Sequence, residues 1–285
     1  MYSIGKIFVV IPVHNRRAFT EQCLRSLELQ TYSDFTTIVV DDGSTDETSE
    51  MVVNKFPQVQ LIRGDGNLWW TGGVNLGIEK ALSQEASFVL TMNDDTMISA
   101  NFIEEMVKVA SKHPNAILGA VEADIKTKKL IYAGQQHSRW PYLKSTRLLD
   151  NLPGEPSQEL YEVGVYHGRG LWIPTKSFNI IGLFDYRKFP HYLADFDFTC
   201  NATKAGIKIY ANFNTIVYSY PDESGEKKIK TSKTLSNYYQ HLFSRRGGAN
   251  LRDYTNYVVK NCPLPIVPIE LTLGYARRLL GFWIH

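Results

Sequence analysis

The chain has 285 residues, of which 44% are hydrophobic and 21% are charged. This balance is typical of globular domains and excludes a wholly disordered or low-complexity chain. There are 31 lysines and arginines against 29 acidic residues, and the net charge of +2 is too small to indicate nucleic acid as the main partner.

The first hundred residues alternate between strand and helix patterns. Apolar, β-branched runs predict buried strands over residues 7–13, 37–40, 59–62 and 88–92. Helical patterns cover residues 20–30 and 74–82. A further helix is expected after the turn 41–45, with Ser44 or Thr45 as its N-cap. Single helices between strands imply right-handed crossovers, and therefore a mainly parallel, Rossmann-like central sheet flanked by helices.

The second half of the chain has a different pattern. Between residues 117 and 173 the predicted strands are short and their connections are rich in Gly, Pro and Gln. Helical patterns return at residues 195–204 and in the C-terminal third. We therefore predict one α/β domain over residues 1–220, with a ligand-binding half at about 1–100 and an irregular half at about 101–220. A basic loop and a helical extension would follow over residues 221–285.

The predicted extension is basic, with ten lysines and arginines against five acidic residues. Four of its lysines, at 227, 228, 230 and 233, lead into Arg245 and Arg246, which predicts either a lid that meets a diphosphate or a solvated loop. Apolar residues then share one helical face: Ile269, Leu273, Ala276, Leu280 and Trp283. This face suits either peripheral membrane contact or a helix–helix contact, as in a homo-oligomer.

The cysteines and the apolar runs indicate in which cellular compartment the protein is expected. The three cysteines form no Cys-x-x-Cys pair, so neither a disulfide framework nor a cysteine zinc cluster is expected. The N-terminus lacks the pattern of a cleaved signal, and no stretch approaches the roughly 18 apolar residues of a membrane-spanning helix. We expect a cytoplasmic protein, with the basic tail giving peripheral contact at the cytoplasmic face of the inner membrane as one option.

Polar clusters follow three of the predicted strands. They are Pro12-Val-His-Asn15, Asp41-Asp42-Gly43 and Asn93-Asp94-Asp95. Each cluster taken alone suits a simple turn. However, open α/β sheets bind ligands beyond the carboxyl ends of their strands, and all three clusters fall at that edge. The coincidence predicts a binding site.

These clusters could bind a ligand made of a base, a ribose and a diphosphate. Asp42 can accept from a base and Asp94 from ribose hydroxyls, while Asp95 can hold a divalent cation together with phosphate oxygens. The chain has neither a G-x-G-x-x-G fingerprint after the first strand nor a G-x-x-x-x-G-K-[ST] loop, and the latter argues against a P-loop NTPase.

These clusters carry a resemblance to a known family. The segments Val9-Val-Ile-Pro-Val-His-Asn15, Val39-Val-Asp-Asp-Gly-Ser-Thr-Asp46 and Asn93-Asp-Asp95 resemble the signatures of family 2 glycosyltransferases with the GT-A fold, of the kind that builds bacterial surface polysaccharides. The resemblance covers about residues 6–210. It implies that Asp95 binds Mn²⁺ or Mg²⁺ in the family's DxD motif, whose first carboxylate is replaced here by Asn93. The residues it implies for the nucleotide-sugar are Pro12, Val13, Asn15, Asp42, Gly43, Asn67, Trp70, Gly73, Asn75, Asn93 and Asp94.

The glycine-rich segment 64–77 is similar to a family segment that lies over the donor. Gly72 and Gly73 would permit close backbone approach, with N–H groups at a helix start facing phosphate. Asn75 offers a side-chain amide, and Trp69 and Trp70 can stack on the donor sugar. The alternative is that one tryptophan belongs to the core and the glycines only turn the chain.

The acceptor side is expected later in the chain. Ala194-Asp-Phe-Asp197 resembles the family's Glu-Asp-x-Asp element without its glutamate. The resemblance implies that Asp195 is the catalytic base, although an N-cap of the following helix is the alternative. Asp197 would support the local framework on the acceptor side. Arg169, between two glycines, and His191 are further acceptor-side candidates.

Together these features predict a metal-assisted, inverting glycosyltransferase. It would move a sugar from a UDP- or dTDP-sugar to a hydroxyl of a saccharide or lipid-linked saccharide acceptor. The alternatives are a sugar nucleotidyltransferase and a catalytically inactive subunit with the same fold. The loop 12–17 fits the nucleotidyltransferase poorly, whereas the missing glutamate at Ala194 keeps the inactive subunit open.

Overall fold

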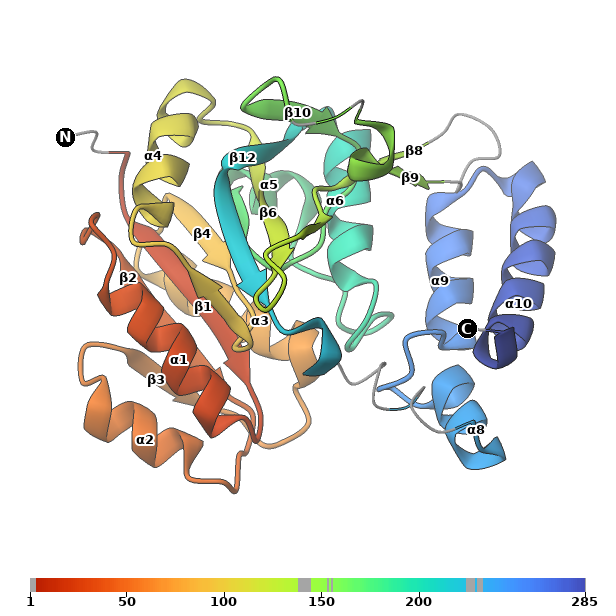
Figure 1. Ribbon diagram of the computed structural model, residues 1–285, viewed down its shortest axis with the longest axis horizontal. Coiled ribbons are helices and arrows are strands. Elements are labelled where there is room, and N and C mark those ends of the chain that lie inside the picture. Colours follow the sequence, from red (N-terminus) through yellow and green to blue (C-terminus); the bar gives the residue numbers. More distant parts are fainter. Residues whose placement is uncertain are drawn as a thin grey trace.

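A computed structural model describes residues 4–137, 145–152, 154, 156–223, 229 and 233–284. Its main sheet runs in the order β10-β12-β6-β11-β4-β1-β2-β3, with β5 paired to β12 and β7 to β6 (Figure 1). The strands are β1 (Ile7–Val13), β2 (Thr36–Asp41), β3 (Gln60–Arg63), β4 (Phe88–Thr91), β5 (Thr96–Ile98), β6 (Ile117–Asp124), β7 (Leu130–Tyr132), β10 (Leu160–Val163), β11 (Leu171–Pro174) and β12 (Ile209–Ser219). A separate hairpin pairs β8 (Gln135–His137) with β9 (Ser145–Arg147).

The first four long strands form the parallel part of the sheet. β1 pairs in parallel with β2 and β4, and β2 pairs in parallel with β3. Beyond β4 the direction alternates, because β11 is antiparallel to both β4 and β6, while β6 and β12 are again parallel. The predicted α/β architecture with a mainly parallel sheet is therefore confirmed, and the irregular second half completes the same sheet.

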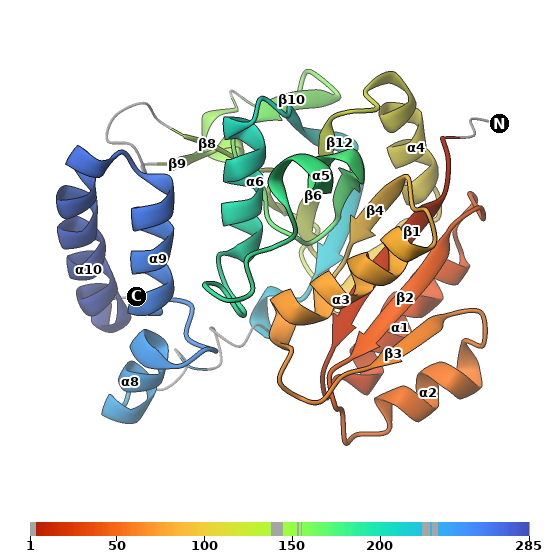
Figure 2. The ribbon, with the colours of Figure 1, turned by 180° about the vertical axis from the view of Figure 1, so that it is seen from behind.

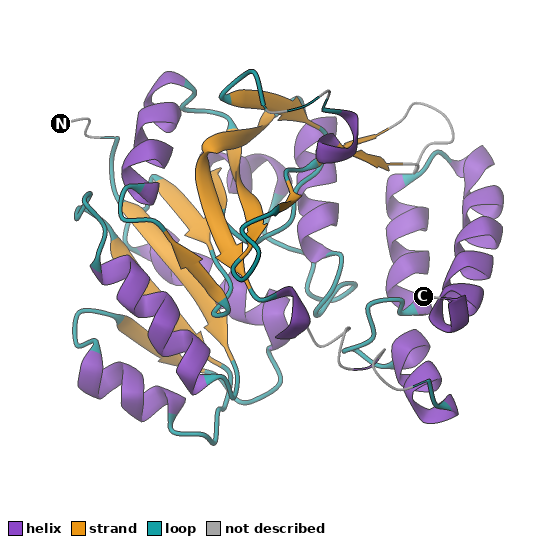
Figure 3. Ribbon diagram, in the orientation of Figure 1, coloured by secondary structure: helices purple, strands orange, loops and turns teal. Residues whose placement is uncertain are grey.

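Helices cover both faces of the sheet (Figures 2 and 3). They are α1 (Arg17–Glu28), α2 (Thr48–Lys55), α3 (Trp69–Ser83), α4 (Phe102–Lys112), α5 (Lys176–Ile181) and α6 (Ala194–Lys204). One apolar core packs residues of α3, α5 and α6 against the sheet, and a second packs α1, α2 and α4 against the opposite face. The central strands β1, β2, β4, β6 and β11 are buried on both sides, which explains the continuous apolar runs in the sequence.

Three predicted helix starts were wrong. Helix α1 begins at Arg17 instead of residue 20. Helix α3 begins at Trp69 instead of residue 74, because the Asp42 carboxylate accepts a 2.9 Å hydrogen bond from the Trp69 N–H and supplies an N-terminal anion from outside the helix. Gly73 lies within α3. A Cβ at this position would lie 3.0 Å from the Pro12 Cβ, so the absence of a side chain lets α3 approach β1 closely. Helix α2 begins at Thr48, whose N–H is accepted by Asp46 at 3.2 Å.

The C-terminal extension is helical, as predicted. It contains α8 (Leu235–Phe243), α9 (Leu251–Asn261) and α10 (Val267–Ile284), with α9 and α10 side by side in both views. Tyr254, Val258 and Cys262 form a small core between α9 and α10. The predicted apolar face of α10 lies exposed at Leu273, Leu280 and Trp283. Lys227, Lys228 and Lys230 of the predicted lid lie outside the described residues.

Among the described residues, no helix is both long and apolar enough to cross a membrane. Cys23, Cys200 and Cys262 are buried and free.

Candidate functional site

Polar side chains from three parallel strands meet at one edge of the sheet. β1 ends at Val13, β2 at Asp41 and β4 at Thr91, so the clusters at 14–15, 41–43 and 93–95 all follow carboxyl ends of neighbouring strands. This edge is where open α/β sheets bind their ligands.

Asn15 and Asp41 shape the first two loops. Asn15 has a left-handed backbone with φ 53°, and its Oδ1 accepts the Thr45 N–H at 2.7 Å. The Asn15 N–H donates to Ser44 Oγ at 2.8 Å, and Asp41 Oδ1 accepts the Ser44 N–H at 3.0 Å. These bonds hold the 44–45 turn ahead of α2. The prediction that Ser44 or Thr45 caps this helix is wrong, because Glu47 occupies the N-cap position.

Asp42 joins the loop after β2 to the loop after β3. It is buried, with Oδ1 accepting from the Gly66 N–H at 2.8 Å and Oδ2 from the Trp69 N–H at 2.9 Å. Each carboxylate oxygen can accept a further hydrogen bond, so Asp42 keeps capacity for a ligand. The adjacent Gly43 has φ +71°, and a Cβ there would lie 3.0 Å from the Gly66 nitrogen, so this close turn requires glycine.

Two residues expected at the donor have structural partners. Asn75 is buried in α3, and its side-chain amide donates to the Phe184 carbonyl at 2.8 Å and accepts the Phe184 N–H at 3.1 Å. Both polar groups of the amide thus have a partner in the fold, and the contact of Asn75 with the donor stays a prediction. Gly73 lies over Pro12 in the helix–sheet contact, where it faces β1 and not a phosphate. Val13 is buried, and its carbonyl accepts the Asp42 N–H at 2.9 Å.

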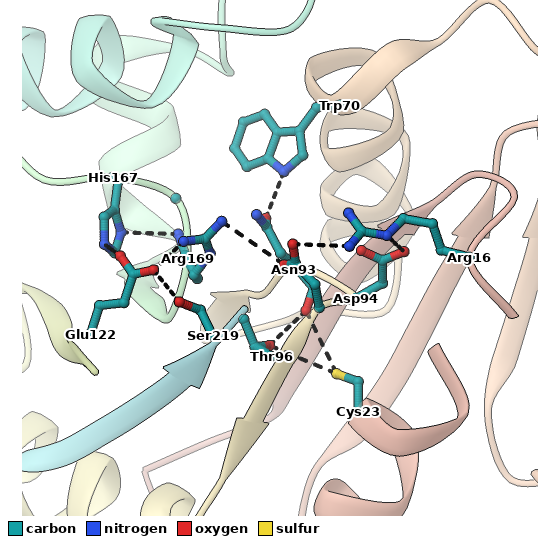
Figure 4. A network of polar contacts seen from close by, with 12 residues as sticks. Arg16, Cys23, Trp70, Asn93, Asp94, Thr96, Glu122, His167, Arg169 and Ser219 are labelled. Carbon is teal, nitrogen blue, oxygen red and sulfur yellow. Dashed lines mark hydrogen bonds and ion pairs between the residues drawn. The ribbon is translucent and has the colours of Figure 1, made fainter. Parts of the chain in front are cut away.

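Asp94 and Asp95, termed the acidic pair below, are buried and contact two arginines. Figure 4 shows Asp94 beside one of them, Arg16. Arg16 places Nε 3.6 Å from Asp94 Oδ2 and Nη2 3.2 Å from Asp95 Oδ2, while Arg169 Nη2 is 3.9 Å from Asp95 Oδ1. Burial raises the pKa of Asp94 to about 7, against the opposing effect of Arg16. Asp94 Oδ2 and Asp95 Oδ1 are buried without a hydrogen-bond partner.

Arg169 is held by a second carboxylate that the sequence analysis missed. Glu122 on β6 binds the Arg169 guanidinium and also contacts His167 Nε2 at 3.0 Å and Ser219 Oγ. Burial alone would raise the pKa of Glu122, but Arg169, His167 and Ser219 outweigh it and hold that pKa well below its usual range. The available signal was an acidic side chain within the otherwise apolar run 117–123. Arg16 was also missed, although it directly follows the Asn15 motif.

Asp195 is the second residue of α6 and contacts the loop that carries Arg169. Its Oδ2 accepts the Gly168 N–H at 2.9 Å and its Oδ1 accepts the Phe196 N–H at 2.9 Å. Burial raises the pKa of Asp195, and the Gly168 N–H and His167 partly oppose that rise. Gly168 directly precedes Arg169, so one loop connects Asp195 with the acidic pair.

Trp70 contacts both Asn93, next to the acidic pair, and Gly168, next to Arg169. Its indole N–H donates to Asn93 Oδ1 at 2.9 Å (Figure 4). Its ring is packed so tightly on Gly168 that a Cβ there would lie 2.5 Å from it and 3.5 Å from the Asp195 Cβ. Asn93, Trp70, Gly168 and Asp195 therefore form one continuous wall.

The comparisons with known proteins agree with this geometry. The model of the family described as glycosyl transferase family 2 matches residues 8–171, more than half of the chain. The chain belongs to glycosyltransferase family 2. It is an enzyme of the glycosyltransferase class, and the sugar nucleotidyltransferase alternative is set aside.

Relatives of this glycosyltransferase include an N-acetylglucosaminyl-diphospho-decaprenol L-rhamnosyltransferase of Mycobacterium tuberculosis. It is 25% identical over 239 residues, which cover 76% of this chain and 77% of the relative. Among solved structures, S. aureus TarS 1–349 in complex with UDP-GlcNAc has a TM-score of 0.58 at 15% identity, covering 98% of this chain and 89% of that chain. GalNAc-T7 with UDP, GalNAc and Mn²⁺ has a TM-score of 0.62 at 16% identity, covering 97% of this chain and 55% of that one. Both structures share the GT-A fold.

The acidic pair of this glycosyltransferase fits a divalent cation. Asp95 Oδ1 is a buried carboxylate oxygen without a hydrogen-bond partner, and Asp94 Oδ2 beside it also lacks one. Mg²⁺ and Mn²⁺ take hard oxygen ligands of this kind, so Asp95 could hold the cation. No group of three or more His, Cys, Asp or Glu in the described part of the chain is placed to hold a metal. Substrate phosphate oxygens and water would therefore complete the coordination.

Asp197 is directed away from the acidic pair of the glycosyltransferase. It is buried, with Oδ2 2.7 Å from Lys260 Nζ and Oδ1 accepting from the Asn261 side-chain amide at 2.9 Å. Lys260 also contacts Asp185 at 3.0 Å. These bonds fasten α6 to α9, which gives Asp197 a framework role.

His191 contacts Trp69, the residue before Trp70. Its ring packs edge-on against Trp69 at 5.7 Å, and its Nδ1 is buried without a hydrogen-bond partner. Burial, with Arg246 nearby, lowers the pKa of His191 to about 4. The predicted lid residues Arg245 and Arg246 lie over the Trp69 ring at 5.4 Å and 5.9 Å. Asn67 is exposed beside them and lines a cavity.

Proposed function

We propose that this glycosyltransferase moves a sugar, with inversion, from a UDP- or dTDP-sugar to a hydroxyl of a lipid-linked saccharide, with the help of Mn²⁺ or Mg²⁺. The product would enter a cell-envelope polysaccharide. The observation that carries the proposal is the link between Asp195 and the acidic pair through Gly168 and Arg169. A candidate base and a candidate metal site thus share one connected group of buried polar residues.

Asp195 suits the role of the base. Its carboxylate is anchored by two backbone N–H groups, and each oxygen keeps capacity to accept a proton or hydrogen bond from an acceptor hydroxyl. Burial raises the pKa of Asp195, which brings its basicity closer to neutral pH. The acceptor oxygen would attack the anomeric carbon as its proton passes to Asp195, while the bond from that carbon to the diphosphate oxygen breaks and the nucleoside diphosphate leaves.

The opposite side of the reaction needs positive charge. Asp94 would bind ribose hydroxyls and Asp95 would hold the cation, which when bound neutralises the charge that develops on the departing diphosphate. Arg16 and Arg169 lie beside the acidic pair and would stabilise the same charge. Holding donor and acceptor in one site supplies the orientation that a single displacement requires.

The relatives support the choice of substrates. The mycobacterial relative is named for transfer of rhamnose to a lipid diphosphate that carries N-acetylglucosamine, and TarS was crystallised with UDP-GlcNAc. A lipid-linked acceptor would place this chain at the cytoplasmic face of the inner membrane, where the exposed apolar residues of α10 and the exposed Arg277 would contact lipid. Contact with a second copy through α10 is the competing use of that face.

A transfer assay tests the proposal. The chain is incubated with UDP- and dTDP-sugars, Mn²⁺ or Mg²⁺ and a lipid-linked saccharide, and the anomeric configuration of the product is read by NMR. We expect inversion and release of nucleoside diphosphate. Retention at the anomeric carbon, or consumption of nucleoside triphosphate in place of the nucleotide-sugar, would contradict it.

The metal role has its own test. Asp95→Ala is expected to weaken nucleotide binding in the presence of Mn²⁺ and to make the titration insensitive to the metal, because a ligand of the cation is lost. Asp34→Ala, which changes an exposed aspartate, serves as the control. Identical calorimetric titrations of wild type and Asp95→Ala, with and without Mn²⁺, would remove Asp95 from the metal site.

A further inference from the structure

A cavity of about 580 Å³ lies between the start of α3, the loop at 186–190 and the segment that joins α8 to α9. Neither the acidic pair nor Asp195 lines it, so it is separate from the proposed reaction centre. Its volume lies within the range of small-molecule binding sites. Its position next to Trp69 places it one residue from Trp70, which is part of the wall around Asp195.

The cavity is lined by three arginines and one carboxylate. Arg187, Arg245 and Arg252 contribute positive charge, and in the described part of the chain none of them has a carboxylate within ion-pair distance. Arg245 lies over the face of Trp69 at 5.4 Å, and this contact restricts the orientation of its guanidinium. Planar guanidinium groups of this kind bind phosphate through paired hydrogen bonds.

Asp253 gives the cavity a second kind of contact. Its side chain is only 4% exposed, and its Oδ2 is buried without a hydrogen-bond partner while it lines the cavity. A carboxylate there repels a bare anion but accepts hydrogen bonds from sugar hydroxyls. Trp69 and Tyr186 add aromatic surface to the lining, which suits the apolar face of a sugar ring. The lining therefore fits a phosphorylated sugar better than either a free sugar or a free phosphate.

Apolar surface next to the cavity indicates that such a ligand could carry an alkyl chain. Phe243 lines the cavity and is 54% exposed at the end of α8. Leu235 and Tyr239 on the same helix are also exposed, so apolar surface continues outward from the cavity along α8. An alkyl chain that leaves a bound diphosphate would meet this surface.

We propose that this cavity binds the sugar-diphosphate group of a lipid-linked acceptor, with Arg245 and Arg252 on the diphosphate and Asp253 on a sugar hydroxyl. The inference rests on the proposed function, which supplies the lipid-linked acceptor. The diphosphate of the donor is the other source of the same chemistry, and the experiment below separates the two.

The test compares two soluble probes by calorimetry: decyl N-acetylglucosaminyl diphosphate, and decyl N-acetylglucosaminide, which lacks the diphosphate. We expect the wild-type chain to bind the first probe more tightly. The double variant Arg245→Ala/Arg252→Ala should lose about tenfold or more of that affinity, because charge-assisted hydrogen bonds to phosphate are removed. Its affinity for UDP and dTDP should not change. Arg25→Ala on α1, which removes an arginine paired with Glu21, is the matched control and should bind as wild type does.

Three results would overturn the assignment. They are equal binding of the two probes, an unchanged affinity of the double variant, and displacement of the diphosphate probe by saturating UDP or dTDP, which would place it in the donor site. Failure of the proposed function has a different signature. In that case the probe binds in an Arg245- and Arg252-dependent manner, but no nucleotide-sugar transfers to it.

Discussion

Replacing Asp195 by asparagine tests the proposed base with little change in shape. A carboxylate has two acceptor oxygens, and here they accept from the Gly168 and Phe196 N–H groups. Asparagine has one acceptor oxygen, so one of these N–H groups loses its partner, at a cost of about 1–3 kcal/mol. A loss of that size lowers the melting temperature by several degrees in a chain of this length. The chain should therefore remain folded at assay temperature.

The expected catalytic loss is larger than the structural one. Removing a general base costs about 10²- to 10⁴-fold in rate, or roughly 3–5 kcal/mol of barrier. We expect the Asp195→Asn variant to keep wild-type affinity for the nucleotide-sugar, measured by calorimetry, and to lose transfer by that factor, measured as nucleoside diphosphate released per folded molecule.

Asp197→Asn is the matched control, because Asp197 lies on the same helix and binds Lys260 and Asn261 instead. It should lower the melting temperature while transfer per folded molecule stays near wild type. The assignment of the base is refuted if Asp195→Asn retains more than about a tenth of wild-type transfer, or if the two variants lose transfer equally.

Three further predictions address the surroundings of the site. Gly168→Ala should slow transfer and destabilise the chain by about 1–3 kcal/mol in chemical denaturation, because its Cβ would lie 2.5 Å from the Trp70 ring; normal stability would show that Trp70 can move aside. Glu122→Gln should cost about 3 kcal/mol or more of unfolding free energy, because it leaves Arg169 without its main buried partner, whereas Glu162→Gln, in an exposed pair, should cost much less; equal effects would contradict the network. Burial lowers the pKa of His191 in the folded state to about 4, so the unfolded chain binds a proton at this residue more readily between about pH 6.5 and 4. The free energy of unfolding should therefore fall as the pH falls through this window. In urea unfolding, His191→Phe should show a smaller fall than wild type. Parallel pH profiles of the two proteins would remove His191 as the cause.

The strands and the edge that carries the site followed from the sequence. The run at 7–13 is apolar throughout, and the run at 37–40 is apolar after Thr37, because both faces of these strands are covered. The parallel order then brings Asp42 and the acidic pair to one edge, since carboxyl ends of neighbouring parallel strands lie together. Helix starts were less predictable, because α3 begins where Asp42, 27 residues earlier, accepts the Trp69 N–H.

The partners of individual side chains were decided by the tertiary structure alone. An asparagine has the same hydrogen-bonding groups in a ligand site as in a core, and only the approach of Phe184, 109 residues away, commits Asn75 to the core. Likewise, nothing local connects Glu122 with Arg169, or Asp195 with Gly168, before β6, β11 and α6 assemble. Residue types fix what a side chain can donate or accept. Which group it meets depends on contacts between distant segments, and these exist only in the folded chain.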